Sequence, residues 1–284
     1  MRIAVLSGKG GTGKTFVATS LAAVASQGVY LDCDVEEPNG HLFFQPQFIA
    51  RQEVEVPVPQ VDHSKCTGCR RCVEFCRFKA LAYVGQLLIF EEMCHSCGGC
   101  TLFCPEQALS EKPRVIGKIE QGWSEDTLVC SGFLNPGEES GVPIIAQMIK
   151  ECLKGQTIVI DSPPGSSCNV MESVATADYC LLVAESTAFG IHNLTTVSEL
   201  VTLFQKPHGV IINKTMGQDH LVEAYCQERD IHIIGSIPFD KEVGKALSKG
   251  TLVVRDNTHY RRVFQEYLET ITREVALHET VARA

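Results

Sequence analysis

A glycine-rich loop near the N-terminus constrains the fold of this chain more than any other feature. Residues 8–15 read GKGGTGKT and follow the short apolar run IAVL at residues 3–6, with Ser7 between them. Residues 16–28 come next with apolar side chains at helical spacing, which predicts a helix that closes on Gly28. A buried strand, a glycine-rich loop and a helix in this order form a phosphate loop, whose backbone N–H groups surround an anion. The loop therefore predicts an α/β domain that binds a nucleotide.

The motif assigns roles to several residues of the nucleotide site. We expect Lys14 to reach the β- and γ-phosphates, and the Thr15 hydroxyl to bind Mg²⁺. Asp161 directly follows the apolar run TIVI, as does a Walker B carboxylate that holds Mg²⁺ at the end of a strand. The loop itself supplies the remaining contacts, and the residues expected to bind ATP or ADP there are Gly8, Gly10, Gly11, Thr12 and Gly13.

Strand and helix patterns alternate along the second half of the chain. Apolar runs at residues 179–185, 209–214 and 231–240 predict strands, and the segments at 191–204 and 220–229 have helical spacing. Alternation of this kind indicates a doubly wound, mainly parallel sheet with helices on both faces.

The loop also contains a second lysine, Lys9, five residues before Lys14. The sequence KGGTGK with this additional lysine resembles the deviant Walker A motif of the MinD/ParA/Mrp/nitrogenase-iron-protein superfamily. The segments DSPPG, ESTAFGIHNL, INK and IPFD resemble the same superfamily. The resemblance implies that Lys9 contacts the nucleotide of a facing subunit, in an ATP-dependent homodimer or a heterodimer with a paralogue. The alternative is that Lys9 is a solvated loop lysine.

Further roles are implied by the same resemblance. Asp34 corresponds to the aspartate that orients the attacking water, although Asp32 is a rival that could instead anchor the loop. Asn213 corresponds to the asparagine that reads adenine, and Pro238 to the proline that flanks the base. The resemblance thus implies a P-loop ATPase, in which the catalytic residues are Lys9, Lys14 and Asp34.

Eight of the fourteen cysteines lie within residues 66–104. Residues 66–76 read CTGCRRCVEFC and residues 94–104 read CHSCGGCTLFC, so the C-x2-C-x2-C-x3-C pattern repeats at a constant offset of 28. Thiolates at this spacing hold a 4Fe–4S cluster, because the tight loop turns three sulfurs toward one centre. Disulfides are disfavoured in the reducing compartment that we expect for this chain.

The cysteine region resembles bacterial two-cluster ferredoxins, in which the fourth cysteine of each run binds the other cluster. One departure is Arg77, which replaces the proline that usually follows the fourth cysteine and that is present as Pro105 in the second run. The alternatives are zinc, which prefers separated pairs of ligands, and clusters that only stabilise a small insert. The resemblance implies a first site formed by Cys66, Cys69, Cys72 and Cys104, and a second formed by Cys94, Cys97, Cys100 and Cys76.

The cysteine region interrupts the nucleotide-binding pattern. We expect an inserted α+β ferredoxin-like domain at residues 61–109 within an ATPase domain formed by residues 1–60 and 110–284. The segment VEVPVPQVDH reads as an extended linker into the insert, and SEKPRVIGKIEQG as the return. The segment FLNPGEESG that follows has no role that its residues suggest.

Charge and hydropathy exclude several classes of partner. The formal net charge is −9 and there is no basic run, so a nucleic-acid partner is not expected. There is no apolar stretch of membrane-spanning length and the N-terminus lacks the pattern of a signal peptide, which favours a cytoplasmic protein. Glutamates match the arginines of the amphipathic stretch at residues 260–275, so we expect a helix packed on the sheet rather than a membrane anchor.

These features together predict an ATPase that couples nucleotide-dependent dimerisation to electron transfer through two 4Fe–4S clusters, with a redox or iron–sulfur protein as partner. One alternative is a redox-sensing positioning or assembly switch. The other is an ATP-dependent carrier of iron–sulfur clusters, which is weakened because no C-x-x-C pair occurs outside residues 66–104.

Overall fold

A nine-stranded sheet forms the centre of the computed structural model, which describes residues 1–152, 157–217 and 220–282. The strand order is β11-β10-β9-β1-β8-β2-β7-β6-β3, and the strands from β11 to β7 are all parallel. These parallel strands are β1 (Arg2–Leu6), β2 (Val29–Asp32), β7 (Thr127–Leu134), β8 (Ile158–Asp161), β9 (Tyr179–Glu185), β10 (His208–Thr215) and β11 (His232–Pro238). The prediction of a mainly parallel α/β sheet is confirmed.

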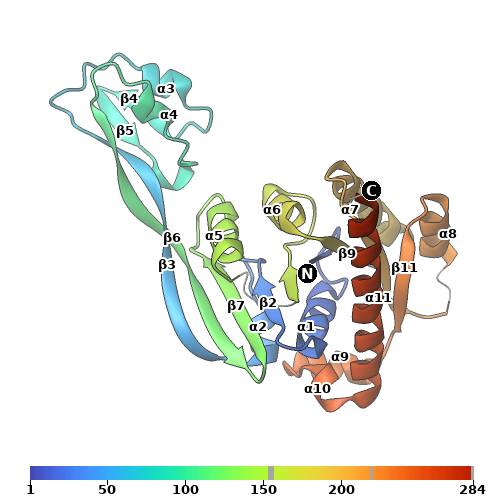
Figure 1. Ribbon diagram of the computed structural model, residues 1–284. Coiled ribbons are helices and arrows are strands. Elements are labelled where there is room, and N and C mark those ends of the chain that lie inside the picture. The colour runs from blue at the N-terminus through green and yellow to red at the C-terminus, as the bar shows by residue number, and fades with distance from the viewer. Residues whose placement is uncertain (153–156, 218–219, 283–284) are drawn as a thin grey trace.

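Helices cover both faces of the sheet (Figure 1). Successive residues of β1 alternate between two cores: Ala4 and Leu6 pack with α5, α6, α7 and α8, whereas Ile3 and Val5 pack with α1, α10 and α11. This alternation follows from the two-residue period of a strand that is buried on both faces. The helices are α1 (Lys14–Val24), α2 (Gly40–Phe44), α5 (Val142–Cys152), α6 (Cys168–Thr176), α7 (Ala188–Leu203), α8 (His220–Glu228), α9 (Lys241–Ser248), α10 (Val253–Asp256) and α11 (Thr258–Ala282).

The C-terminal helix α11 packs on the sheet, as its charge pattern predicts. Its buried residues include Phe264, Tyr267 and Ile271, and the Phe264 ring lies 5.4 Å from that of Phe16 in α1. Among the described residues, none of the helices combines the length and apolar character needed to cross a bilayer.

Two long antiparallel strands, β3 (Gln47–Val61) and β6 (Leu109–Ser124), form a ribbon at the edge of the main sheet (Figure 1). The expectation that residues 54–63 and 110–122 are linkers is therefore wrong for most of both segments. Alternate valines at positions 54, 56 and 58 are buried, which makes this proline-containing segment a strand. The prolines are tolerated because β3 is an edge strand, where Pro57 pairs with Pro113.

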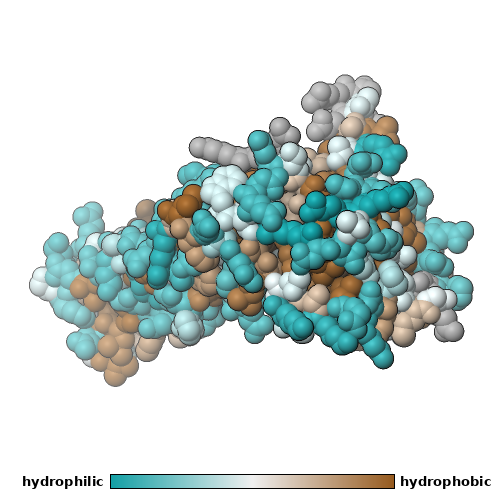
Figure 2. Space-filling view, turned by 90° about the horizontal axis from the view of Figure 1, so that it is seen from below, coloured by the Kyte–Doolittle hydropathy of each residue, from teal (hydrophilic) through white to brown (hydrophobic). Residues whose placement is uncertain are grey.

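The ribbon carries a small head formed by the residues between Val61 and Leu109, at the far end from α1 (Figure 1). Its core consists of Leu81, Leu87 and Leu109, against which several cysteines pack. The head exposes large apolar side chains such as Leu102 and Phe103, and apolar side chains also gather at the narrow end of the molecule in Figure 2. Its elements are α3 (Arg71–Phe75), β4 (Leu81–Val84), β5 (Gln86–Ile89), the 3-10 turn η1 (Glu91–Met93) and α4 (Gly99–Leu102).

The sequence repeat is also a structural repeat within the head. The helix α3 begins after Arg70, whose φ is 61°, and α4 begins after Gly98, whose φ is 70°. These two residues are 28 positions apart, as the cysteines are. Each cysteine run therefore turns through the left-handed region at the same point before its short helix.

Candidate functional site

The glycine-rich loop joins β1 to α1 at the carboxyl edge of the parallel strands. Gly11 and Gly13 have φ values of 81° and 91°, which other residues rarely adopt. A side chain at Gly13 would also collide with the Asn213 amide, 2.1 Å from the position of its Cβ. Nothing lies within 4 Å of a Cβ placed at Gly10 or Gly11, so this side of the loop is open to an anion.

Lys14 and Asp161 meet beneath the loop. The Lys14 ammonium contacts the Asp161 carboxylate at the end of β8, and the pair is almost fully buried. The Tyr30 hydroxyl donates to the other Asp161 oxygen at 2.8 Å. The structure thus brings together the predicted phosphate lysine and the predicted Walker B aspartate.

The two aspartates at the end of β2 have different surroundings. Asp32 is fully buried and accepts a hydrogen bond from the Gly40 N–H at 2.8 Å, so it holds the start of α2. Burial and the nearby Asp161 carboxylate raise the pKa of Asp32 to about 8. Asp34 is only partly buried, and burial raises its pKa to about 6. The structure therefore gives Asp32 an anchoring contact and leaves the Asp34 carboxylate more accessible.

Several buried oxygens near the loop have no hydrogen-bond partner within the described part of the chain. They are Thr12 Oγ1, Asp32 Oδ1 and Ser162 Oγ, which lie in the loop, at the end of β2 and after β8. Buried polar atoms normally have partners, so unpartnered oxygens at a strand edge indicate a site for a ligand, an ion or water. Hydroxyl and carboxylate oxygens are the ligands that Mg²⁺ prefers, so this part of the structure fits a Mg²⁺–nucleotide.

Lys9 is directed toward the end of β9. Its ammonium lies 3.1 Å from Glu185 and 5.1 Å from the centre of the Phe189 ring. Glu185 also pairs with Lys214 at 2.6 Å, and Lys214 donates to the Gly11 carbonyl at 2.6 Å. The Lys9 ammonium is therefore paired within its own chain here, at the end of β9.

The residues predicted to contact the base, Asn213 and Pro238, come from neighbouring strands. Asn213 in β10 is buried and donates its side-chain N–H to the Thr12 carbonyl at 2.7 Å. Pro238 ends β11, is exposed, and pairs in register with Thr215. The structure thus shows Asn213 supporting the loop backbone, a contact that its position in the sequence did not predict.

The eight cysteines of the repeat fall into two pockets in the head. The grouping is the same as the crossed division that the resemblance implies, with each fourth cysteine beside the other run. One pocket is lined by Cys66, Cys69, Cys72 and Cys104, and the other by Cys76, Cys94, Cys97 and Cys100. These two quartets of thiols fit two clusters, although ligation itself stays a prediction.

Among the described residues, no group of three or more His, Cys, Asp or Glu side chains could hold a metal ion. Four thiols line each of the two pockets, and the choice between a 4Fe–4S cluster and zinc in them stays a prediction. Of the other cysteines, Cys168 is exposed and the remaining five are buried.

A cavity lies between the second cysteine pocket and the nucleotide loops. It is lined by Cys94 from the head, Arg114 from β6, Glu138 from the loop before α5, and Cys168 from α6. Arg114 and Glu138 form a two-pronged ion pair with distances of 2.6 and 2.7 Å. Sequence reasoning missed both residues, because nothing in the sequence indicated that residues 133–141 lie beside the ribbon.

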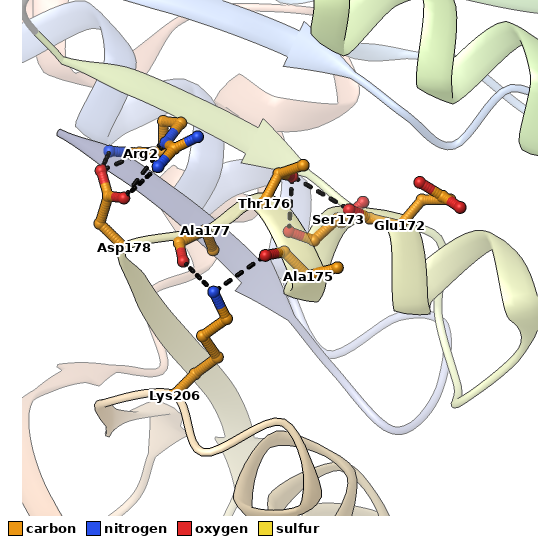
Figure 3. Close-up of polar contacts among 8 residues, drawn as sticks. All are labelled: Arg2, Glu172, Ser173, Ala175, Thr176, Ala177, Asp178 and Lys206. Carbon is orange, nitrogen blue, oxygen red and sulfur yellow. Dashed lines mark hydrogen bonds and ion pairs between the residues drawn. The ribbon is translucent and has the colours of Figure 1, made fainter.

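The helix α6 is held at the end that points away from this cavity. Lys206 donates to the carbonyls of Ala175 and Ala177 at 2.9 Å each, and Arg2 pairs with Asp178 (Figure 3). The cation satisfies carbonyls at the helix C-terminus. The N-terminal residue Cys168, which lines the cavity, lies at the opposite end.

A comparison with protein families gives a match that covers most of the chain. The profile of the "CobQ/CobB/MinD/ParA nucleotide binding domain" matches residues 3–253. Three proteins of Methanocaldococcus jannaschii are similar along most of the chain. The uncharacterized protein MJ0578 is 30% identical and MJ0579 is 28% identical, each over 95% of this chain and 96% of its own length. The uncharacterized ATP-binding protein MJ0823 is 25% identical over 87% of this chain and 88% of its own length.

Solved structures share the fold. The cell division ATPase MinD of Pyrococcus furiosus has a TM-score of 0.59 at 17% identity, covering 96% of this chain and 98% of that chain. The septum site-determining protein MinD of Pyrococcus horikoshii, solved with Mg-ADP, has a TM-score of 0.59 at 15% identity, covering 95% of both chains.

Proposed function

The chain belongs to the CobQ/CobB/MinD/ParA nucleotide-binding family, and on this premise we propose that it is an ATPase that couples nucleotide-dependent dimerisation to electron transfer. The open glycine loop, with unpartnered oxygens beside it, supports binding of ATP and Mg²⁺. Lys14 binds the phosphates, Thr15 and Asp161 hold Mg²⁺, and Asp34 orients the attacking water. Asn213 reads the adenine and Pro238 flanks the base.

The proposed role of Lys9 depends on dimerisation. In a single chain its ammonium is paired with Glu185, close to the loop but outside the Lys14 site. In the proposed ATP-bound dimer Lys9 leaves Glu185 and neutralises phosphate charge on the facing subunit, as an arginine finger does. Glu185 keeps a cationic partner, because Lys214 also contacts it.

The observation that carries the redox part of the proposal is the sorting of eight thiols into two pockets within one head. When bound, two 4Fe–4S clusters supply one-electron carriers at adjacent sites. Residues 61–109 then form a ferredoxin-like domain inserted into the ATPase domain of residues 1–60 and 110–284. The exposed apolar side chains Leu102 and Phe103 offer a surface for a redox or iron–sulfur protein partner.

The proposal is tested by anaerobic purification or reconstitution, followed by iron and sulfide analysis, EPR, and sedimentation with ADP–Mg²⁺ or ATP–Mg²⁺. We expect about eight iron atoms per chain, corresponding to two four-iron clusters, and a dimer that forms with ATP. A chain that binds one zinc ion and no iron would contradict the redox part. Clusters that pass rapidly to an apo-protein would instead favour the cluster carrier.

A further inference from the structure

The loop of residues 135–141, between β7 and α5, contacts the chain next to Asp34. The Leu134 N–H at its start donates to the Val35 carbonyl at 2.8 Å. At its end, a Cβ placed on Gly141 would lie 2.3 Å from a methyl group of Val35, so the Gly141 backbone is closely packed against the Val35 side chain. A displacement of Val35 would therefore shift both ends of this loop.

The same loop is fastened to the ribbon that carries the head. The Asn135 N–H donates to the Ile116 carbonyl at 2.9 Å. Glu138 accepts two hydrogen bonds from the Arg114 guanidinium, and the side chains of Arg114 and Glu138 are only 16% and 9% exposed. A two-pronged, largely buried pair of this kind fixes geometry more strongly than an exposed ion pair does.

Arg114 in turn lies beside the second cysteine pocket. It shares the cavity lining with Cys94, one of the thiols of that pocket. Cys94 also packs against the hydrophobic core on the face of the sheet that α5, α6, α7 and α8 cover. Among the residues lining the first pocket, by contrast, none belongs to the cavity or to the loop 135–141.

We propose that the Arg114–Glu138 ion pair transmits the nucleotide state from Asp34 and Val35 to the second cysteine quartet, and not to the first. This inference rests on the proposed ATPase with two clusters and names the regulation of that site. Arg114 and Glu138 are positioning residues. While they are paired, the glutamate largely neutralises the arginine. When the loop moves with the nucleotide, the guanidinium acts on Cys94 with its full charge, which favours the more negative, reduced form of the second site.

The test uses the full chain with both clusters, titrated anaerobically and followed by EPR with ADP–Mg²⁺ and with a non-hydrolysable ATP analogue. In the unaltered protein we expect only the second site to change its reduction equilibrium, by tenfold or more, which is about 59 mV for one electron. Glu138→Gln should raise the potential of the second site and remove its dependence on the nucleotide. Arg114→Gln should lower that potential and also remove the dependence.

The matched control is Lys112→Gln. Lys112 lies on the same strand as Arg114 and pairs with Glu91 at 2.7 Å. Within the described part of the chain, neither Lys112 nor Glu91 forms a hydrogen bond or ion pair with the loop 135–141. This control removes one positive charge near the head and should leave the nucleotide-dependent shift intact. Cys76→Ser identifies the signal of the second site by altering it.

The outcomes separate the two proposals. If the unaltered protein shows no nucleotide-dependent shift at either site, both the coupling function and this inference fail. If a shift occurs but survives in Arg114→Gln and Glu138→Gln, or belongs to the first site, the inference is overturned and the coupling function stands. If either variant loses its clusters, hydrogen exchange measured on the unaltered protein tests the inference instead. We expect the nucleotide to change the protection of backbone amides at both 135–141 and 94–96. A change confined to the phosphate loop overturns the inference.

Discussion

The Lys14 ammonium lies against the Asp161 carboxylate in a pair whose side chains are 7% and 0% exposed. These are the residues proposed to bind phosphate and Mg²⁺, and here each neutralises the other. A Mg²⁺–nucleotide brings both a cation for Asp161 and an anion for Lys14. Binding can therefore separate the pair without leaving either charge buried and unpaired.

Replacing Lys14 with methionine should abolish nucleotide binding and also destabilise the fold. The substitution leaves the Asp161 carboxylate buried without its cation, which costs about 3–5 kcal/mol. Fluorescent-nucleotide titration and urea denaturation measure the two effects. The double variant Lys14→Met/Asp161→Asn should regain most of the stability but no nucleotide affinity. A single variant as stable as the unaltered protein would show that the pair does not form.

The Lys9→Ala variant should keep nucleotide affinity and lose hydrolysis. Lys9 lies outside the Lys14 site of its own chain, and its proposed target is the nucleotide of the facing subunit. Loss of a charge that acts as an arginine finger lowers the rate by about 10³-fold or more. The rate of steady-state phosphate release and the fraction of dimer that sedimentation detects with ATP should both fall. The control is Lys245→Ala, which removes an exposed lysine that pairs with Glu242. Normal turnover by the Lys9 variant would assign Lys9 to a purely local contact with Glu185.

The nucleotide-free protein should lose stability as the pH rises from about 4 to about 8. Burial and the Asp161 carboxylate raise the pKa of Asp32 to about 8, whereas an unfolded aspartate titrates near 3.9. Within this window the folded state retains a proton that the unfolded state releases, so raising the pH favours unfolding.

Urea denaturation across this range, without Mg²⁺, checks the expectation. Asp32→Asn keeps an acceptor for the Gly40 N–H and should flatten the profile. Asp34→Asn should flatten only the part below about pH 6, because the pKa of Asp34 is raised to about 6. If the stability of the unaltered protein and that of Asp32→Asn changed with pH in the same way, the raised pKa could not belong to Asp32.

The crossed grouping of cysteines predicts which cluster each variant damages. Cys104 belongs to the second run in the sequence but lines the pocket of the first. Cys104→Ser should therefore alter the EPR signal of the first site, and Cys76→Ser that of the second. Loss of one cluster would leave about four iron atoms per chain. Cys168→Ser, which changes an exposed cysteine outside both pockets, is the control. Damage to the second site by Cys104→Ser would reverse the grouping.

Local patterns predicted the nucleotide edge of the fold well. The strand β1, the glycine loop and α1 follow the order that the motif requires, and β8 ends at Asp161 as expected. One detail differs: the helix ends at Val24, and Gln27, not Gly28, has a left-handed conformation with φ of 49°. The position of a helix end varies by one or two residues, and a sequence pattern does not choose between adjacent residues there.

Long-range pairing could not be predicted from the same patterns. Prolines at 57 and 59 suggested a linker, although their segment forms an edge strand once β6 is beside it. The partners of Arg114 and Asn213 lie 24 and 201 residues away in the sequence, in Glu138 and Thr12. Contacts of this kind depend on how the chain returns in space, which no local spacing encodes.

The most direct test of the central claim is a redox titration of the unaltered protein by EPR, first with ADP–Mg²⁺ and then with a non-hydrolysable ATP analogue. The account predicts that exchanging the nucleotide shifts at least one reduction potential by about 59 mV or more, a tenfold change in the equilibrium constant. Identical potentials in both nucleotide states would contradict direct coupling. An ATPase rate that then depended on the oxidation state of the protein would instead favour the redox-sensing switch.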